Sequence, residues 1–257
     1  MHNKLKNLLH TLVSEHGLLS LKAGTEWENM DYTEIEYLFS IGEKQVPILV
    51  KISGPEAKTD LRHLRDIGVN GILGPMIESV YALEKFVLVT QQDYAGSGID
   101  PLLAINIETI VGYRQLDDLL ASSAFQSIDT VVIGRLDLSL SMGIEDVDHP
   151  DVEAVTQDIA KQVRKAGKHV SVGGFVNPSS AHELQNSAID RLSTIHTMFD
   201  LNQVQDAAAT IWKAIEFEIA YYQALIERNA ARAAFYQERI DTSQAKLDKA
   251  TDNRLTH

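Results

Sequence analysis

Two acidic residues, Glu108 and Asp137, stand just past short apolar runs that are typical of β-strands. Glu108 directly follows the run 102–107, and Asp137 comes shortly after the run 130–134. The ends of successive strands open on one face of a parallel α/β barrel, where the chemistry takes place. Two carboxylates on that face suit a hard divalent cation, which prefers oxygen ligands and leaves positions open for a substrate. The alternative is that both acids only stabilise helix starts, through capping and the helix dipole.

Three basic residues, Lys22, Lys51 and Arg135, fall at the ends of the same kind of run. A lysine inside an apolar strand such as 48–52 is costly to bury unless it reaches a polar mouth and a partner. The lysines could instead extend along the surface into solvent. Beside two carboxylates, a cationic rim suits a small anionic substrate whose carbonyl is polarised by a metal ion. We therefore expect these three residues to take part in catalysis through a metal-stabilised enolate, which allows a carbon–carbon bond to form or break.

Other residues at strand ends should complete this site. We expect the substrate to contact Glu26, Pro75, Ser139 and Gly173. His196 is the one histidine at an expected strand end, and a structural role for it is as plausible as a catalytic one. A rival mechanism uses Lys22 or Lys51 as a Schiff-base nucleophile, which requires a desolvated lysine of lowered pKa. The pair of acids favours the metal.

The elements that must position these residues alternate between short apolar and longer amphipathic segments, which is the pattern of βα units. Eight strands followed by helices, in a chain of 257 residues, predict an α/β fold of the (β/α)8 (TIM) barrel type. An open doubly wound sheet is the second choice, although no GxGxxG follows an early strand. Strands are expected at 17–23, 46–52, 71–75, 85–90, 102–107, 130–134, 169–173 and 190–196, and helices at 32–41, 56–67, 79–84, 112–122, 151–166 and 181–186.

The C-terminal segment differs from the rest because no glycine or proline occurs after Pro178. Apolar residues recur between 211 and 240 close to a helical period, and a single helix over this segment would be about 60 Å long. That is longer than the barrel can cover. We therefore expect residues 1–200 to form the barrel with a short N-terminal helix, and 201–257 to form a long helix that makes a homo-oligomer. The alternative is a bend at Asn229 into a helical hairpin on the same barrel.

Composition restricts the partners and the compartment. The formal net charge of −13 argues against nucleic acid, since phosphate binding needs clustered Lys and Arg. The absence of cysteine excludes disulfides and thiolate metal sites and favours a reducing compartment. The N-terminal apolar run is too short for a signal peptide, and no stretch approaches the roughly 20 apolar residues of a membrane span. We expect a cytoplasmic protein with no membrane partner.

The two acidic segments resemble motifs of the HpcH/HpaI aldolase and citrate lyase β-subunit superfamily. Residues 106–109, Asn-Ile-Glu-Thr, are similar to its Gln-Ile-Glu-Thr, and residues 134–139, Gly-Arg-Leu-Asp-Leu-Ser, are similar to its Gly-Pro-x-Asp-Leu-Ser. Residues 75–79 also match a family strand. The resemblance, over about 17–180, implies a (β/α)8 barrel that binds Mg²⁺ or Mn²⁺ through Glu108 and Asp137. It implies action on 2-oxo acids or acyl-CoA thioesters, and a last helix that packs on a neighbouring subunit.

Three residues depart from the family pattern. Lys51 stands where the aldolases have an arginine that orients the 2-oxo acid, and lysine loses the bidentate geometry. Trp27 stands where the pyruvate aldolases have a catalytic histidine, and Arg135 replaces a proline. The sequence thus predicts a metal-dependent carbon–carbon lyase or aldolase. The alternatives are a non-catalytic barrel that binds a small acid or assembles with partners, and the Schiff-base aldolase.

Overall fold

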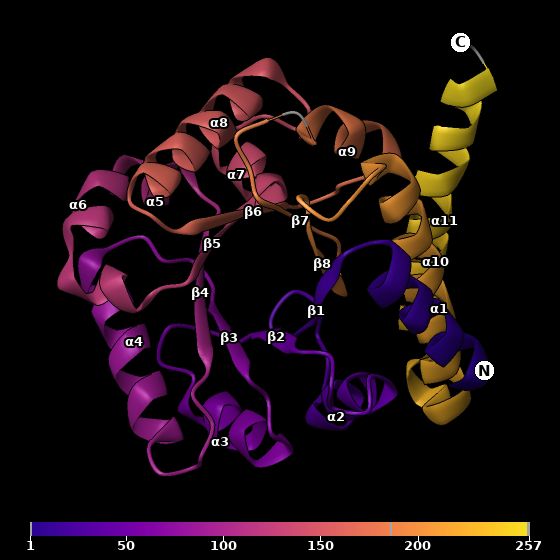
Figure 1. The fold of residues 1–257 in the computed structure, drawn as a ribbon, viewed down its shortest axis with the longest axis horizontal. Coiled ribbons are helices and arrows are strands. Elements are labelled where there is room, and N and C mark those ends of the chain that lie inside the picture. Colours follow the sequence, from indigo (N-terminus) through magenta and orange to yellow (C-terminus); the bar gives the residue numbers. More distant parts are fainter. Residues whose placement is uncertain (1, 186, 256–257) are drawn as a thin grey trace.

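Eight short strands close into a barrel in chain order (Figure 1). The computed structural model describes residues 2–185 and 187–255. The expected boundaries at residues 1, 186 and 257 lie outside this part of the chain. The first seven strands are parallel neighbours, and each pairs with the next along the chain. The strands are β1 (Leu18–Gly24), β2 (Ile48–Lys51), β3 (Gly71–Gly74), β4 (Leu102–Ile107), β5 (Thr130–Gly134), β6 (His169–Gly173), β7 (Arg191–Ser193) and β8 (Thr197–Asp200).

Helices surround the strands and form the outer layer of the barrel (Figure 1). Several have clear sequence signals at their starts: Asp31 caps one helix in a capping box, and Asn177 caps another that opens with a proline. The helices are α1 (His2–Glu15), α2 (Tyr32–Ile41), α3 (Lys58–Ile67), α4 (Val80–Tyr94), α5 (Ile110–Arg114), α6 (Leu116–Ala121), α7 (Arg135–Ser141), α8 (Pro150–Lys165), α9 (Pro178–Leu184), α10 (Ala207–Arg228) and α11 (Ala233–Leu255), with 3₁₀ turns at Ser123–Ser127 and Ala230–Arg232.

The last strand makes the barrel mixed, because β8 runs antiparallel to both β7 and β1. Only residues 194–196 connect β7 to β8. Such a turn joins antiparallel strands, whereas a parallel pair needs a crossover of about a dozen residues or more. The expected strand at 190–196 therefore corresponds to β7 and the turn after it, and the sequence pattern missed β8.

The expected strand at 85–90 was wrong, since these residues lie in the middle of α4. The apolar run with Val87 and Val89 favours a strand by residue type. The buried positions Leu83, Phe86, Val87, Thr90 and Tyr94 instead follow the three- and four-residue spacing of one helix face. The period of burial, rather than the β-branched composition, decides the structure here.

The C-terminal segment forms two helices instead of one. Asn229 ends α10 in a non-helical conformation, and a 3₁₀ turn leads into α11. The two helices pack closely along their lengths and lie side by side at the edge of the barrel (Figure 1). The segment therefore forms the helical hairpin that the sequence offered as the alternative. A role in oligomerisation stays a prediction.

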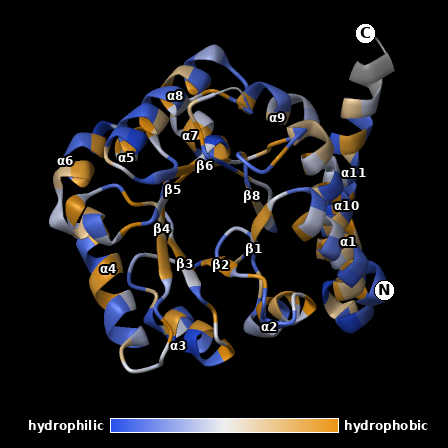
Figure 2. Cartoon of the chain, in the orientation of Figure 1, coloured by the Kyte–Doolittle hydropathy of each residue, from blue (hydrophilic) through white to orange (hydrophobic). Residues whose placement is uncertain are grey.

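Two apolar cores hold the fold. The large core lies between the strands and the helix layer, and a small one fills the barrel with Leu49, Leu73, Ala104, Val132 and Met198. Polar residues dominate the outward sides of the helices (Figure 2). Because the barrel interior is filled at this level, the free space is restricted to one end. Among the described residues, no helix is long and apolar enough to cross a membrane.

Candidate active site

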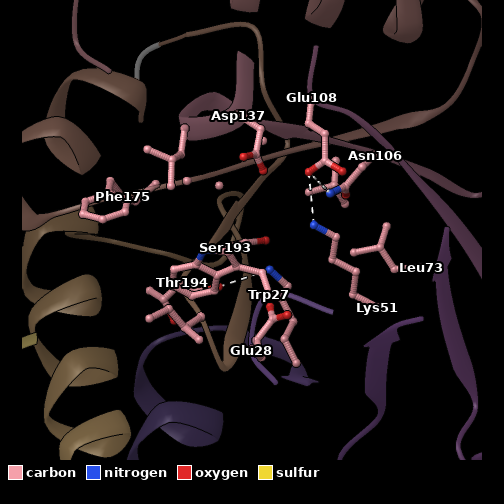
Figure 3. A pocket seen from close by; sticks show the side chains of 18 of the residues that line it. Trp27, Glu28, Lys51, Leu73, Asn106, Glu108, Asp137, Phe175, Ser193 and Thr194 are labelled. Carbon is pink, nitrogen blue, oxygen red and sulfur yellow. Dashed lines mark hydrogen bonds and ion pairs between the residues drawn. The ribbon is translucent and has the colours of Figure 1, made fainter. Parts of the chain in front are cut away.

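A cavity of about 300 Å³ opens at the carboxyl ends of the strands. Side chains from β1, β2, β4 and the loops after β5, β6 and β7 line it, and α11 contributes a further wall. Figure 3 shows Glu108, Asp137 and Lys51 facing one another across this space. The position agrees with the rule that barrel enzymes place their chemistry at the carboxyl ends of the strands.

Glu108 is held by its neighbours in a fixed orientation. It is 3 % exposed and lies directly after β4. The backbone N–H of Met76 donates to its Oε1 at 3.0 Å, and the Asn106 amide donates to its Oε2. Met76 has a positive φ of 51°, a strained conformation for this residue type, and that strain aims its N–H at the carboxylate. Gly134 leaves room for Glu108, because a Cβ at that position would lie 2.9 Å from the Glu108 Cβ.

Asp137 lies beside Glu108, in the first turn of α7. Burial raises the pKa of Asp137, and the neighbouring Glu108 carboxylate raises that pKa further. Gly174 allows the loop after β6 to approach this turn: its φ is +83°, and a Cβ there would lie 2.6 Å from the Leu136 nitrogen. Two carboxylates are thus brought together where their mutual repulsion opposes ionisation of both.

Lys51 is the cation nearest to this carboxylate pair. Its Nζ lies 3.2 Å from Glu108 Oε2 and 2.8 Å from Glu26 Oε2, in a side chain that is 9 % exposed. Burial alone would lower the pKa of Lys51, but the Glu108 and Glu26 carboxylates outweigh it and hold that pKa well above its usual range. Lys51 is therefore a permanent cation at the floor of the cavity. Glu26 contacts Lys51 but does not itself line the cavity, so its expected contact with substrate stays a prediction.

Lys22 has a different environment on the same cavity wall. Its Nζ donates to the Thr194 carbonyl at 3.1 Å, and within residues 2–185 and 187–255 no carboxylate lies within ion-pair distance of it. Burial lowers the pKa of Lys22, and the nearby charge of Lys51 adds to this. The Glu28 carboxylate opposes the shift from across the cavity. Lys22 is thus the lysine of this pair that can exist as a neutral amine.

Buried groups behind the cavity fix the turn at 194–196, whose Thr194 carbonyl accepts a hydrogen bond from Lys22. Glu218 of α10, 1 % exposed, accepts from the Thr194 hydroxyl and from the His196 N–H. His196 is also buried, bonding the Lys22 carbonyl through Nδ1 and the Tyr222 hydroxyl through Nε2. Burial lowers the pKa of His196, which favours its neutral form. His196 does not line the cavity, so it belongs to the support of the turn.

The donor set fits a divalent cation. Glu108 and Asp137 supply carboxylate oxygens, and the buried Asn106 Oδ1 beside them has no hydrogen-bond partner among the residues that the structure describes. A hard cation bound by one or two carboxylates, with substrate and water completing its shell, has this composition. No cluster of three or more His, Cys, Asp or Glu suited to a metal occurs in the described part of the chain.

Four residues expected in the site do not line the cavity, and one of them, Glu26, only contacts Lys51 beside it. Arg135 is 2 % exposed, and its Nη1 pairs with Asp148 Oδ1 at 3.1 Å. Ser139 is fully buried and donates to the Leu136 carbonyl, so it closes the turn of α7. Pro75 is buried and positions Met76, whose N–H reaches Glu108. The residues that do line the cavity as expected are Lys22, Lys51, Glu108, Asp137 and Gly173.

Several lining residues carried no sequence signal. Ser193 ends β7, Thr194 lies in the turn after it, and Phe175 lies in the loop after β6. The turn at Thr194 could not be placed without β8, which the pattern missed. The residues from α11 depend on the bend at Asn229 and are Glu238, Arg239, Thr242 and Lys246.

A barrel with charged side chains at the carboxyl ends of its strands has the architecture of a large class of enzymes. The family model for HpcH/HpaI aldolase/citrate lyase matches residues 33–204. This chain therefore belongs to the HpcH/HpaI aldolase/citrate lyase family and is a carbon–carbon lyase. The resemblance expected from the motifs around Glu108 and Asp137 is confirmed, and neither the non-catalytic barrel nor the Schiff-base aldolase is favoured.

Curated relatives include two kinds of aldolase. The chain is 26 % identical to a hydroxypyruvate/pyruvate aldolase of Pseudomonas aeruginosa, over 60 % of this chain and 68 % of that protein. It is 27 % identical to a 2-keto-3-deoxy-L-rhamnonate aldolase of Klebsiella pneumoniae, over 53 % of this chain and 58 % of that protein. The alignment with the second thus spans little more than half of that relative's length.

Solved structures of the family share the fold. An HpcH/HpaI aldolase from Desulfitobacterium hafniense matches with a TM-score of 0.61 and 18 % identity, over 76 % of this chain and 82 % of that one. A family protein from Burkholderia cenocepacia matches with a TM-score of 0.60 and 17 % identity, over 76 % and 83 %. At these identities the likeness shows the barrel and says nothing about the substrate.

Proposed function

We propose that this lyase acts on a 2-oxo acid, with a divalent metal ion held by Glu108 and Asp137 and with the Asn106 amide oxygen beside them. The single observation that carries the proposal is the meeting of these two carboxylates, from β4 and α7, at one end of the barrel. When bound, the cation draws electron density from the 2-oxo group and stabilises negative charge on its oxygen. Mg²⁺ and Mn²⁺ both suit such oxygen ligands.

Lys51 holds positive charge where the negative charge develops. Its ion pair with Glu26 and Glu108 fixes the ammonium at the cavity floor, so no reorganisation is needed during reaction. In this position it can also attract the substrate carboxylate. A lysine serves as a point charge rather than a bidentate clamp, which leaves the orientation of the substrate to the metal and the cavity walls.

Lys22 exchanges the proton of the reaction. Its amine lines the cavity and donates to the Thr194 carbonyl, and burial lowers its pKa, which favours the neutral form. A base with a pKa lowered toward the working pH transfers protons efficiently. Lys22 Nζ therefore takes a proton from the carbon or hydroxyl next to the 2-oxo group and returns it at the end of the cycle. This assigns to Lys22 the role that a histidine at the position of Trp27 would otherwise have.

Metal binding tests the proposal without knowledge of the substrate. Titration of the protein with Mn²⁺, followed by electron paramagnetic resonance, should show a specific site in the parent protein. The Asp137→Asn variant should lose at least about tenfold in affinity, because a ligand oxygen becomes a neutral amide. Asp118→Asn, the same change at an exposed carboxylate on α6, is the matched control and should bind as the parent does. Equal binding by the Asp137 variant would refute the assignment.

We infer a homo-oligomer formed with the help of the C-terminal helices, and a cytoplasmic location. The long α10–α11 hairpin at the edge of the barrel supports the first of these. Light scattering of the full chain, compared with the mass of 28.5 kDa for one copy, tests it directly.

A further inference from the structure

The helix α11 brings its own charged residues to the cavity. Glu238, Arg239, Thr242 and Lys246 line one wall, and their spacing places them on one face of the helix. None of these residues takes part in the chemistry described above. Figure 3 shows Phe175, which contacts this wall, on the far side of the pocket from Glu108 and Asn106. The α11 wall therefore borders the end of the cavity that is remote from the carboxylate pair.

Two cations on this wall are held by aromatic rings. The Arg239 guanidinium lies over the Trp27 ring, 3.8 Å from its centre, and also donates to the Trp27 carbonyl at 3.0 Å. The Lys246 ammonium lies 4.8 Å from the centre of the Phe175 ring. Aromatic faces attract cations and orient them without neutralising their charge. These ring contacts orient Arg239 and Lys246 without pairing either of them with a carboxylate.

The two cations also act on each other. Burial lowers the pKa of Lys246, and the positive charge of Arg239 lowers it further, against the opposing effect of Glu218. Over the described ranges, neither residue has a carboxylate within ion-pair distance. Two like charges confined to a cavity wall repel each other, and an anion between them would relieve this repulsion. Glu238 lines the same wall but, over the described ranges, forms no ion pair with either cation, so both can contact an anionic group of a ligand.

We propose that Arg239 and Lys246 form a subsite for a second anionic group, a carboxylate or a phosphate, at the end of the substrate remote from the reacting carbon. This inference rests on the proposed function, since it assigns the aldehyde fragment of the 2-oxo acid to this end of the cavity. The subsite selects substrates in which the aldehyde fragment carries its own negative charge. Trp27 and Phe175 orient the two cations and form the apolar sides of the passage between the two ends.

A binding measurement tests the subsite without turnover. Glycerol 3-phosphate and glutarate are titrated into the full-length protein in Mg²⁺ by calorimetry, with glycerol as the neutral counterpart. At least one of the two anions should bind, and Lys246→Met and Arg239→Gln should each weaken it by about tenfold or more. Lys249→Met removes a charge from the exposed side of the same helix and should bind as the parent does. Failure of both anions to bind, or binding unchanged in both subsite variants, overturns the proposal.

A kinetic measurement separates the subsite from the proposed function. Addition of pyruvate to succinic semialdehyde, glyceraldehyde 3-phosphate and uncharged glyceraldehyde is followed in Mg²⁺. The preferred charged aldehyde identifies the anion, and its advantage should disappear in Lys246→Met through a higher KM, with glyceraldehyde unaffected. Equal kcat/KM for charged and uncharged aldehydes would support the proposed function and refute the subsite. If no aldehyde is turned over but an anion binds in a way that depends on Lys246, the proposed function is refuted and the subsite is supported.

Discussion

The ammonium of Lys51 lies 3.2 Å from Oε2 of Glu108, so a buried cation forms an ion pair with a proposed metal ligand. The same ammonium reaches Glu26, which follows β1, and thereby ties the ends of three strands together. These contacts orient the Glu108 carboxylate before any substrate arrives. This preorganisation is what an electrostatic site needs, since fixed charges stabilise a developing charge without rearranging.

Replacement of Lys51 should damage both activity and stability. Lys51→Met leaves the buried carboxylate of Glu108 without its cation, and loss of one partner of a buried pair costs about 3–5 kcal/mol. The specific activity should fall by at least about a hundredfold, because the fixed positive charge that stabilises the transition state is lost. Steady-state kinetics and urea unfolding measure the two effects. Lys58→Met, at an exposed position on α3, should change neither, and wild-type activity in Lys51→Met would exclude an essential role.

Gly174 should tolerate no side chain. Gly174 and Gly167 both have positive φ, +83° and +77°, but a Cβ at Gly174 meets the Leu136 nitrogen at 2.6 Å while one at Gly167 meets nothing within 4 Å. Gly167→Ala should cost about 1–2 kcal/mol of unfolding free energy, from the left-handed backbone alone. Gly174→Ala should cost more than this and should also displace the turn that carries Asp137. Equal losses in the two variants would show that the close approach is unimportant.

Acid should remove the stabilising effect of Asp60. Thr25, Tyr32 and the Ser53 N–H all donate to this carboxylate, at 2.7–2.8 Å. Burial alone would raise the pKa of Asp60, but these hydrogen bonds outweigh it and hold that pKa below its ordinary value of 3.8. A lowered pKa in the folded state stabilises the protein above the unfolded-state pKa, and this stabilisation is lost as the pH falls through the folded-state pKa.

The corresponding variant is Asp60→Asn. At pH 7 it should be less stable than the parent by about 2 kcal/mol, because an amide cannot accept all of these bonds. The difference should shrink as the pH falls below 3.8. Urea unfolding at a series of pH values measures it, with the exposed Asp118→Asn as the control. A difference that does not vary with pH would mean that the carboxylate charge contributes nothing.

Lys22 should determine how the rate depends on pH. Burial lowers the pKa of this amine, so its proton is lost at a pH below the ordinary value of 10.5. The parent kcat/KM should rise with pH as the free amine forms. Lys22→Met should lower kcat/KM by at least about a hundredfold and abolish this rising limb, because the base is gone. A Lys22→Met profile with the same limb would assign the proton transfer to another group.

The sequence predicted which residues follow β4 and β5 better than it predicted every strand of the barrel. Glu108 and Asp137 were predictable because each follows an apolar run at a strand end, and the barrel brings such ends together. Arg135 follows the same run, yet its side chain turns away to Asp148. Position at a strand end predicts the face of the barrel, while the direction of the side chain depends on the first turn of α7. The run at 85–90 failed because local composition competes with a helical burial period.

The sequence offered a bend at Asn229 as one alternative, but it did not indicate that α11 would form a wall of the cavity. Arg239 and Lys246 reach the cavity only because the chain bends at Asn229, where no glycine or proline marks a break. The contacts that hold the bend are far apart in the sequence: Arg232 pairs with Glu34 at 3.3 Å, and the Tyr236 hydroxyl donates to the same carboxylate. Glu34 stands out only as a capping residue of α2 when the sequence is read locally. Tertiary packing therefore decides which residues close the site.

The most direct test of the central claim is exchange of the C3 protons of pyruvate with deuterium, followed by nuclear magnetic resonance. This exchange reports enolate formation and needs no aldehyde. We predict exchange in the parent protein with Mg²⁺ or Mn²⁺, its loss in EDTA, its return when metal is added back, and its reduction by at least about a hundredfold in Asp137→Asn. Exchange that continues at the same rate in EDTA and in Asp137→Asn would contradict a metal-stabilised enolate at Glu108 and Asp137.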